Sequence, residues 1–367
     1  MFIKAKLIFM ALLALLLLAG QCGAQPEQGA ALPARESEAA TDQSQTLEAS
    51  FAELTPVPLG SAEKLKVVAT TNIIGDIVKN VGGNRIDLTV MLPAGADPHT
   101  FNPTPGDAAT VADAHVIFIN GLNLEEFMAG LIGNAGGQAV VIPVSTGVET
   151  REFGEAHEHS EGDMETHGHE EDEPEDEEGH EHEEGEADSH QDGADPHIWT
   201  TPVNGIIMAH NIKQALSKLD PANAETYAAN AEAYKAELEA LDTWIKSQVA
   251  TIPAEKRKLV TDHETFGYYA DRYGFEIIGA VIPAASTNAE PSAQEMAQLQ
   301  KTIAETEAKA VFVGTTVSPV LAERLAEDSG IQLVPLYSDS LGEPGSGAET
   351  YLDYLRYNTN AIVGALK

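Results

Sequence analysis

A long helical pattern in the middle of the chain places the strongest constraint on the fold. Residues 220–250 begin with Asp220 as a cap and Pro221 at the first helical position, and the pattern then runs without a break. Six apolar residues recur along it at helical spacing: Tyr227, Tyr234, Leu238, Leu241, Ile245 and Val249. About 30 residues make a helix of roughly 45 Å, which is long enough to brace two separate lobes.

The chain before this helix alternates between strand-like runs and helical segments. Strands are predicted at 66–70, 85–92, 116–120 and 139–143. Helices are predicted at 73–81, from Pro105 with Thr104 as N-cap, near 124–131, and at 201–219. Strands that alternate with helices favour a mainly parallel sheet.

The same alternation returns after the long helix. Strands are predicted at 258–262, 275–282, 310–314 and 331–337, with helices between them and a last helix at 350–366. One of these helices opens with the capping box Ser292-x-x-Glu295. The predicted class is therefore α/β, with two Rossmann-like lobes that have mainly parallel sheets and are joined by one long helix. The expected boundaries are 66–219 for the first lobe, 220–252 for the linking helix and 257–367 for the second lobe.

The N-terminus has the pattern of an export signal. Lys4 and Lys6 precede the apolar run Leu7–Ala19, which is short for a spanning helix, so residues 1–21 are predicted to be a signal peptide. Cys22, the only cysteine, follows in "LAGQC". This resembles a bacterial lipoprotein signal, in which the cysteine is lipidated, although such signals prefer Gly, Ala or Ser where this chain has Gln21. Ordinary secretion with an unmodified thiol is the alternative, and either way no internal disulfide is possible.

Two polar stretches are expected to lie outside the packed lobes. Residues 22–64 are rich in Ala, Gln, Glu, Ser and Pro, which predicts a flexible tether. Residues 155–195 hold 20 acidic residues, seven histidines and no Lys or Arg, so 152–195 is predicted to be an unpacked loop. The histidines would gather metal weakly, unless the tract is only a solvated linker; they are His157, His159, His167, His169, His180, His182 and His190.

The charge of the chain limits its partners. The formal net charge of −37 argues against binding to nucleic acid or to anionic membrane surfaces. A membrane attachment would therefore depend on a lipid at Cys22.

Four candidate metal ligands fall where binding sites form in α/β proteins. The tetrapeptide "ADPH" occurs twice and ends in His99 and in His197, where the chain leaves the acidic tract. His263 follows the strand "KLVTD", and Asp339 follows "IQLVPLY". Since ligands bind at the carboxyl ends of strands, a site that uses all four would lie between the lobes. Three imidazoles and one carboxylate form a tetrahedral set suited to Zn²⁺.

Several sequence blocks resemble the zinc- and manganese-binding lipoproteins that deliver metal to ABC importers. The blocks are "VVATTNIIGDIV", "LPAGADPHTFNPTPGD", "DPHIWTTP", "TDHETFGYYADRYGF" and "YSDSLGEPGSGAETYLDYLRYNTNAIVGAL", and together they cover most of residues 66–367. The resemblance implies metal ligands at His99, His197, His263 and Asp339. It also implies a rigid linking helix, small closure on binding, a permease as partner and a lipid-anchored or periplasmic location. A monomer is expected.

The family resemblance leaves two metals open. In the manganese-selective members the third ligand is usually Glu, whereas this chain has His263, and a His-rich acidic loop is frequent in the zinc members. The block "SDSLGEPGSGAETY" is nevertheless more similar to the manganese branch. The Irving–Williams order favours Zn²⁺ at such a site. Zinc is therefore the prediction, and manganese or dual binding is the alternative.

Less specific interpretations remain for other residues and for the function. We expect His115 and His210 to be structural, while Asp97 and Asp195 either orient the neighbouring histidines or only form Asp-Pro turns. A secreted zinc hydrolase would need an open position for water, and "HETFGYY" lacks the second histidine of H-E-x-x-H. We therefore expect a binding protein and no enzyme. No residue pattern favours an adhesin.

Overall fold

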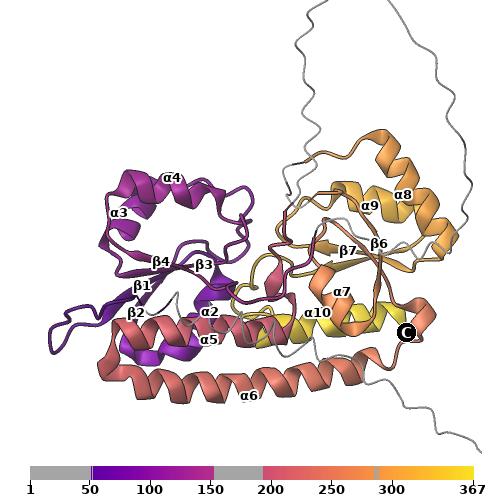
Figure 1. The fold of residues 1–367 in the computed structure, drawn as a ribbon. Helices are drawn as coiled ribbons and strands as arrows, with labels where there is room; N and C mark the ends of the chain where they lie inside the picture. Colours follow the sequence, from indigo (N-terminus) through magenta and orange to yellow (C-terminus); the bar gives the residue numbers. More distant parts are fainter. Residues whose placement is uncertain (1–50, 52, 153–192, 285–286, 288) are drawn as a thin grey trace, which may run out of the picture. The chain divides into compact units, whose positions relative to one another are not determined.

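Two four-stranded sheets form the framework of the protein in this computed structural model (Figure 1). The structure describes Phe51 and residues 53–152, 193–284, 287 and 289–367. All of these residues belong to one compact unit, Gln43–Lys367. The predicted signal peptide, Cys22 and the seven histidines of the acidic tract lie outside the described residues.

The first lobe contains a parallel sheet with the strand order β2-β1-β3-β4. Its strands are β1 (Leu65–Ala69), β2 (Ile86–Val90), β3 (Val116–Ile119) and β4 (Val140–Pro143). Its helical elements are α2 (Asn72–Gly82), η1 (Gly83–Arg85), α3 (Pro105–Asp113) and α4 (Glu126–Ala135). The predicted start of α3 is confirmed, because Thr104 and Asp107 form a capping box there.

The second lobe repeats this topology with the strand order β6-β5-β7-β8, again entirely parallel. Its strands are β5 (Lys258–Thr261), β6 (Glu276–Ala280), β7 (Ala310–Gly314) and β8 (Gln332–Leu336). Its helices are α7 (Gly267–Tyr273), α8 (Ala293–Thr306), α9 (Val320–Ser329) and α10 (Tyr351–Leu366). The predicted α/β class with two lobes is confirmed.

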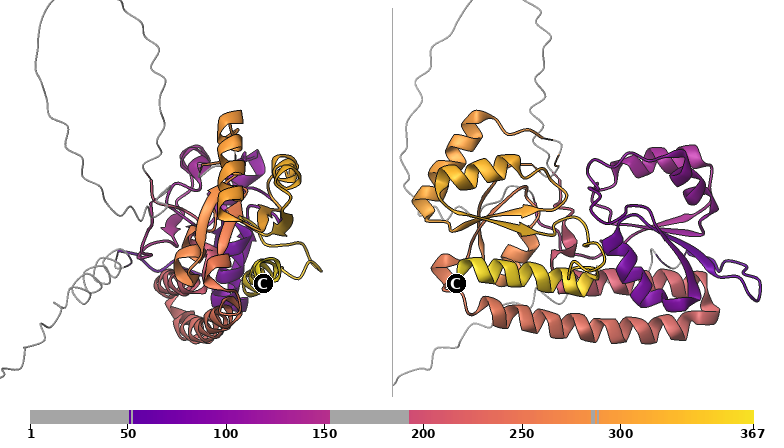
Figure 2. Two further views of the ribbon diagram at one scale, coloured as in Figure 1. Left: turned by 90° about the vertical axis from the view of Figure 1, so that its right-hand side faces the viewer. Right: turned by 180° about the vertical axis from the view of Figure 1, so that it is seen from behind.

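Three long helices connect and support the lobes (Figures 1 and 2). The chain passes from η2 (Ile198–Thr200) into α5 (Pro202–Leu219), then through η3 (Pro221–Asn223) into α6 (Ala224–Val249) and η4 (Ala254–Lys256). Helix α6 runs beneath both lobes in Figure 1, and it packs against α2 and α5 near the first lobe and against α10 near the second. At 26 residues, it is about 39 Å long.

The start of this linking segment differs from the prediction. Asp220 precedes a short 3₁₀ turn, and its side chain caps no backbone amide of a helix. One oxygen of Asp220 instead accepts hydrogen bonds from Tyr227 Oη and Asn223 Nδ2, both at 2.7 Å. The carboxylate therefore holds the turn against α6, so the α-helix begins at Ala224, three residues later than predicted.

Each sheet is covered on both faces. Along β1, Val67 and Ala69 face a large core shared with α2, α5, α6 and α10, while Val68 faces a smaller cluster with α3 and α4. In the second lobe, one face of the sheet likewise packs against the large core. The other face packs against helices α8 and α9 through a separate apolar cluster. The large core extends through both lobes, which explains how the linking helices support them together.

The folded part begins before the predicted end of the tether. Phe51 is buried, and Leu54, Val57 and Leu59 pack against the large core. The amide of Val57 donates a hydrogen bond to the carbonyl of Leu219 at 2.8 Å. These isolated apolar residues lack a helical or strand period, which is why the sequence pattern did not reveal their packing.

Candidate metal centre

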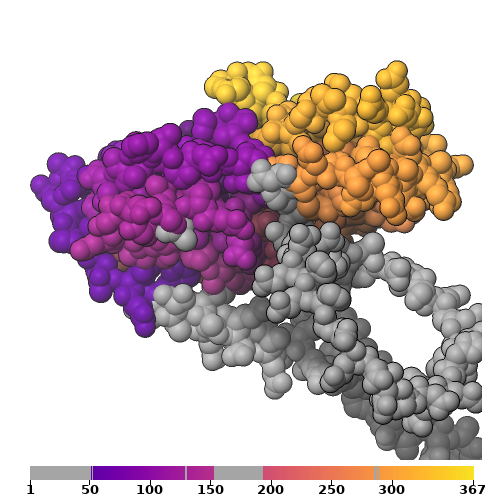
Figure 3. Space-filling model, turned by 90° about the horizontal axis from the view of Figure 1, so that it is seen from above, coloured from indigo at the N-terminus to yellow at the C-terminus, as the bar shows by residue number. Residues whose placement is uncertain are grey.

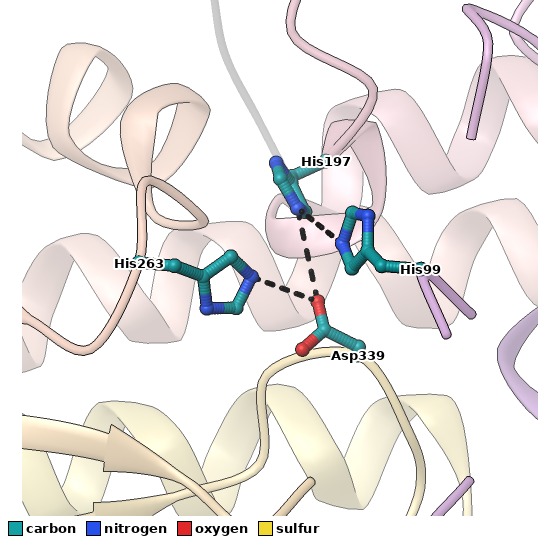
Figure 4. Close-up of side chains that lie close together, drawn as sticks. All are labelled: His99, His197, His263 and Asp339. Carbon is teal, nitrogen blue, oxygen red and sulfur yellow. Dashed lines mark hydrogen bonds and ion pairs between the residues drawn. The ribbon is translucent and has the colours of Figure 1, made fainter. Parts of the chain in front are cut away.

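The four predicted ligand residues come together between the two lobes (Figure 4). Each offers one donor atom, and these atoms all lie within 4.8 Å of one another. The Nε2 atoms of His99 and His197 are 3.3 Å apart. Asp339 Oδ1 lies 3.4 Å from His263 Nε2 and 3.8 Å from His197 Nε2. Three imidazoles and one carboxylate thus enclose a space of the size that a single metal ion occupies.

The fold supplies these side chains from its loops. His99 lies in the loop that follows β2, and His197 directly precedes η2. His263 comes two residues after β5, and Asp339 comes three residues after β8. His99, His263 and Asp339 therefore follow the carboxyl ends of strands, as the sequence predicts.

Hydrogen bonds between the lobes bring the loops together, and Figure 3 shows the two lobes in contact. Asn72 Nδ2 donates to Ser340 Oγ at 2.8 Å, and Asn72 Oδ1 accepts from the amide of Leu341 at 2.9 Å. The amide of Gly95 also donates to Ser340 Oγ, at 2.7 Å. These bonds tie the loop that carries Asp339 to the first lobe.

The centre is almost closed to solvent. His197, His263 and Asp339 are at most 1% exposed, while His99 is only partly buried. Burial lowers the pKa of His99 to about 3, so this imidazole is neutral at physiological pH. A neutral imidazole is the form that binds metal.

His263 and Asp339 form a charged pair in the absence of metal. Burial by itself would lower the pKa of His263, but the carboxylates of Asp339 and Asp262 raise it well above its ordinary value. Burial would likewise raise the pKa of Asp339, but His263, with His99 and His197, lowers it far below its usual range. Both pKa shifts describe one protonation state, in which His263 is protonated and Asp339 is ionised. The positive charge of His263 then neutralises Asp339, as a bound metal cation would.

The two Asp-Pro-His segments act differently. Asp195 Oδ1 accepts hydrogen bonds from His197 Nδ1 at 2.8 Å and from its backbone amide at 2.9 Å. This bond fixes the proton on Nδ1 and leaves the Nε2 lone pair for the centre. Asp97 instead accepts from the backbone amide of His99 at 2.8 Å and from the hydroxyl of Thr287 at 2.5 Å. The contacts of Asp195 therefore support the orienting role considered for it.

The carboxylate of Asp339 is held from behind by two hydroxyls. Its Oδ2 accepts from Ser338 Oγ at 2.6 Å and from Thr316 Oγ1 at 3.1 Å. Its Oδ1 is buried and faces the histidines, and it makes no hydrogen bond of good geometry; the nearest donor, His263 Nε2, is 3.4 Å away. A cation bound closer to Oδ1 would neutralise this oxygen better than the long contact with His263 does.

Sequence reasoning missed the residues that support the ligands. Thr265 Oγ1 lies 2.5 Å from His263 Nε2, and Asp262 accepts the amide hydrogens of His263 and Gly314, each at 2.9 Å. Thr316 and Arg151 also belong to this group. Apart from Asp262 and Thr265, which adjoin His263, their positions in the sequence give no signal, because folding brings them to the centre from distant segments.

Two further histidines lie outside the centre, as expected. His115 Nδ1 accepts a hydrogen bond from the backbone amide of Lys66 at 2.9 Å, which supports the start of β1. His210 lies on the exposed side of α5, with its Nδ1 3.4 Å from Lys213 Nζ. Among the residues that the structure describes, no helix is both long enough and apolar enough to cross a membrane.

Comparisons with known proteins agree with this arrangement. Residues 67–365 match the family described as zinc-uptake complex component A periplasmic. The manganese-binding lipoprotein MntA of Halalkalibacterium halodurans is 32% identical over 305 residues, covering 83% of this chain and 89% of that protein. The manganese ABC transporter substrate-binding lipoprotein PsaA of Streptococcus mitis is 33% identical over 307 residues, covering 83% and 90%.

Solved structures give the same result. The periplasmic zinc-binding protein TroA from Treponema pallidum has a TM-score of 0.67 and 27% identity, covering 83% of this chain and 99% of that chain. A manganese-bound periplasmic metal-binding protein from Candidatus Liberibacter asiaticus has a TM-score of 0.68 and 26% identity, covering 83% and 100%.

These similarities confirm the resemblance that the sequence blocks carry. They also confirm the extracytoplasmic location, lipid-anchored or periplasmic, and the metal-binding role. The chain therefore belongs to the zinc-uptake complex component A periplasmic family, whose members are the metal-binding components of ABC importers.

Proposed function

We propose that the protein captures Zn²⁺ with His99, His197, His263 and Asp339 and delivers it to the membrane permease of an ABC importer. The observation that carries this proposal is the donor set, in which three buried or partly buried imidazoles face one carboxylate oxygen that makes no hydrogen bond of good geometry. Zn²⁺ prefers four nitrogen and oxygen donors in a tetrahedral arrangement. All four donors come from one chain, so the site needs no second copy, and we propose that the protein acts as a monomer.

Manganese is the second candidate. Two relatives at 32–33% identity are named as manganese proteins. Against this, imidazole suits Zn²⁺, carboxylate and water suit Mn²⁺, and the Irving–Williams order places Zn²⁺ above Mn²⁺ at a given site. The excess of imidazoles over carboxylates in this centre favours zinc.

The centre is suited to binding rather than to catalysis. Four side chains converge on one space, so a tetrahedral ion has no open position for a water molecule. A zinc hydrolase needs that water as its nucleophile. We therefore propose that the protein is not an enzyme.

Elemental analysis and a competition experiment between zinc and manganese test the choice of metal. The full chain, purified without added metal, is expected to contain one equivalent of zinc, and an excess of Mn²⁺ should fail to displace it. His197→Ala should lose the tight equivalent, whereas His210→Ala, outside the centre, should keep it. A protein that contains manganese, or that exchanges zinc for manganese readily, would contradict the zinc proposal.

The acidic tract has a separate proposed role. Its seven histidines among 20 carboxylates offer many weak sites for divalent metal. Deleting residues 155–192 should therefore remove several weak equivalents from a calorimetric zinc titration and leave the tight one. Loss of the tight equivalent would show that the tract is part of the main site.

The lipid anchor at Cys22 is also a proposal. Cys22 is the only cysteine and directly follows the apolar run of the signal. Mass spectrometry of membrane-extracted protein is expected to show a diacylglyceryl group at an N-terminal Cys22. A soluble protein with an unmodified thiol would contradict it.

A further inference from the structure

Arg151 joins the back of the metal centre to the second lobe. Its Nη1 lies 3.0 Å from Asp195 Oδ2, and its Nε lies 2.9 Å from Asp271 Oδ2 on α7. The other oxygen of Asp195 accepts the hydrogen bond from His197 Nδ1 at 2.8 Å. A continuous chain of polar contacts thus leads from a surface carboxylate of the second lobe to an imidazole of the centre.

The middle of this chain is a buried carboxylate. Asp195 is 0% exposed, and an unpaired carboxylate at such a place would be strongly unfavourable. Arg151 supplies the opposite charge, and the hydroxyl of Tyr268 on α7 donates to the carbonyl of Asp195 at 2.7 Å. The backbone amide of Asp195 donates to the carbonyl of Arg151 at 2.8 Å. Asp195 is therefore fixed from both lobes.

The first residue of helix α7 has no side chain, which leaves room for the guanidinium of Arg151. This residue is Gly267, and a Cβ atom at that position would overlap Arg151 and come within 2.8 Å of Asp195 Oδ2. A residue without a side chain lets the guanidinium lie against the helix start. Because α7 begins four residues after His263, this contact links the segments that carry His197 and His263.

We propose that Arg151 is a positioning residue of the metal centre. It holds the carboxylate of Asp195 in the orientation that directs His197 Nε2 at the metal, and it couples that orientation to the packing of α7. The proposal rests on the role of His197 as a metal ligand. Partners that orient a ligand in this way typically change metal affinity by about 10- to 100-fold when they are removed.

The geometry requires arginine rather than a general positive charge. Two different nitrogens of one planar group contact two carboxylates on different segments. A lysine has a single ammonium group and would keep the charge but not both directed bonds. Arg151→Lys should therefore restore only part of the affinity that Arg151→Gln loses.

Zinc affinity of the full chain, measured by competition with a chelator, tests the proposal. Arg151→Gln is expected to weaken binding about tenfold, and Gly267→Ala should do the same because it displaces the guanidinium without removing its charge. Asp271→Asn should weaken binding, but less than Arg151→Gln does, because Asp271 is half exposed and Asp195 keeps its guanidinium partner. Arg356→Gln is the matched control: it removes an exposed arginine on α10 whose partner Asp353 lies 3.5 Å away, and it should change nothing.

A spectroscopic readout separates positioning from general stability. The Nδ1 proton of His197, observed by NMR in the zinc-bound protein, should shift and exchange faster in Arg151→Gln and Gly267→Ala. Unchanged affinity and an unchanged proton signal in Gly267→Ala and Arg151→Lys would overturn the proposal, even if Arg151→Gln did not fold. If His197→Ala itself binds zinc normally, the ligand assignment fails instead.

Discussion

At the residue scale, the centre combines two imidazoles whose pKa values are shifted in opposite directions. Burial holds the pKa of His99 at about 3, whereas the carboxylates around His263 keep its pKa above the ordinary value. The metal-free centre therefore keeps a proton on His263, and metal binding must remove it. Binding of a metal ion would therefore exchange one cation for another at the position that faces Asp339.

Proton release follows from these pKa shifts. Zn²⁺ binding should release one proton from His263 at neutral pH and none from His99, so affinity should rise with pH until the raised pKa of His263 is passed. Calorimetric zinc titrations in buffers with different ionisation enthalpies measure the proton. His263→Ala should lose it, and affinity that is constant between about pH 6 and 8 would contradict the prediction.

His263 is also expected to influence which metal the centre prefers. His263→Glu replaces an imidazole by a carboxylate, which Mn²⁺ prefers, so the ratio of zinc to manganese affinity should fall by roughly tenfold, or ~1.4 kcal/mol. Competition between the two metals gives the ratio. His210→Glu adds the same carboxylate on an exposed face of α5 and should leave the ratio unchanged. A constant ratio in His263→Glu would place selectivity elsewhere.

The sequence indicates the four candidate ligands but not the groups that orient them. The convergence of His99, His197, His263 and Asp339 could be predicted because strand ends and family blocks mark their positions. Arg151 contacts Asp195 and Asp271, which are 44 and 120 residues away in the chain. Such contacts depend on how loops pack in three dimensions, and local sequence patterns contain no record of that packing.

At the scale of elements, local chemistry made most strands and helices predictable. The Ser292–Glu295 capping box opens α8, and β7 occupies the predicted residues 310–314. The predicted N-cap at Asp220 is the exception, because its carboxylate accepts a hydrogen bond from the hydroxyl of Tyr227 and none from a backbone amide of the helix. Helix boundaries depend on such competition between local and distant partners.

Helix α6 is fastened to α7 by one carboxylate. Asp242 accepts hydrogen bonds from Arg272 Nε at 2.6 Å, Arg272 Nη2 at 2.7 Å and Tyr273 Oη at 2.8 Å. Burial alone would raise the pKa of Asp242, but Arg272, Lys246 and Tyr273 lower it to about 2. Because Tyr268 on α7 also contacts Asp195, the hydrogen bonds of Asp242 help to hold in place a helix that borders the metal centre.

Asp242→Asn should lower the free energy of unfolding by about 2 kcal/mol near neutral pH, as measured by urea denaturation. The lowered pKa means that the contribution is complete above the ordinary pKa of about 4 and is lost as pH falls through about 2. The difference between the two proteins should therefore shrink in acid. Asp113→Asn, which breaks an exposed pair with Lys66, should cost less than about 0.5 kcal/mol. Equal effects of the two substitutions would contradict this role for Asp242.

At the scale of the whole molecule, two lobes with the same strand order place their carboxyl ends at a shared centre. The shared core and α6 hold the lobes together, while Asn72, Gly95 and Ser340 join the ligand loops directly. The alternation of strands and helices predicted both lobes. The bonds between lobes could not be predicted, because they join residues more than 240 positions apart.

The central claim is that one zinc ion is bound by donors from both lobes. X-ray absorption at the zinc edge of the protein loaded with one equivalent tests it most directly. The expected spectrum shows four nitrogen and oxygen donors at about 2.0–2.2 Å, with the outer-shell scattering of three imidazoles and no sulfur. His99→Ala and His263→Ala, which remove donors from different lobes, should each lose one imidazole signal. A spectrum with a bound water in place of one donor, or with fewer than three imidazoles in the unaltered protein, would contradict the claim.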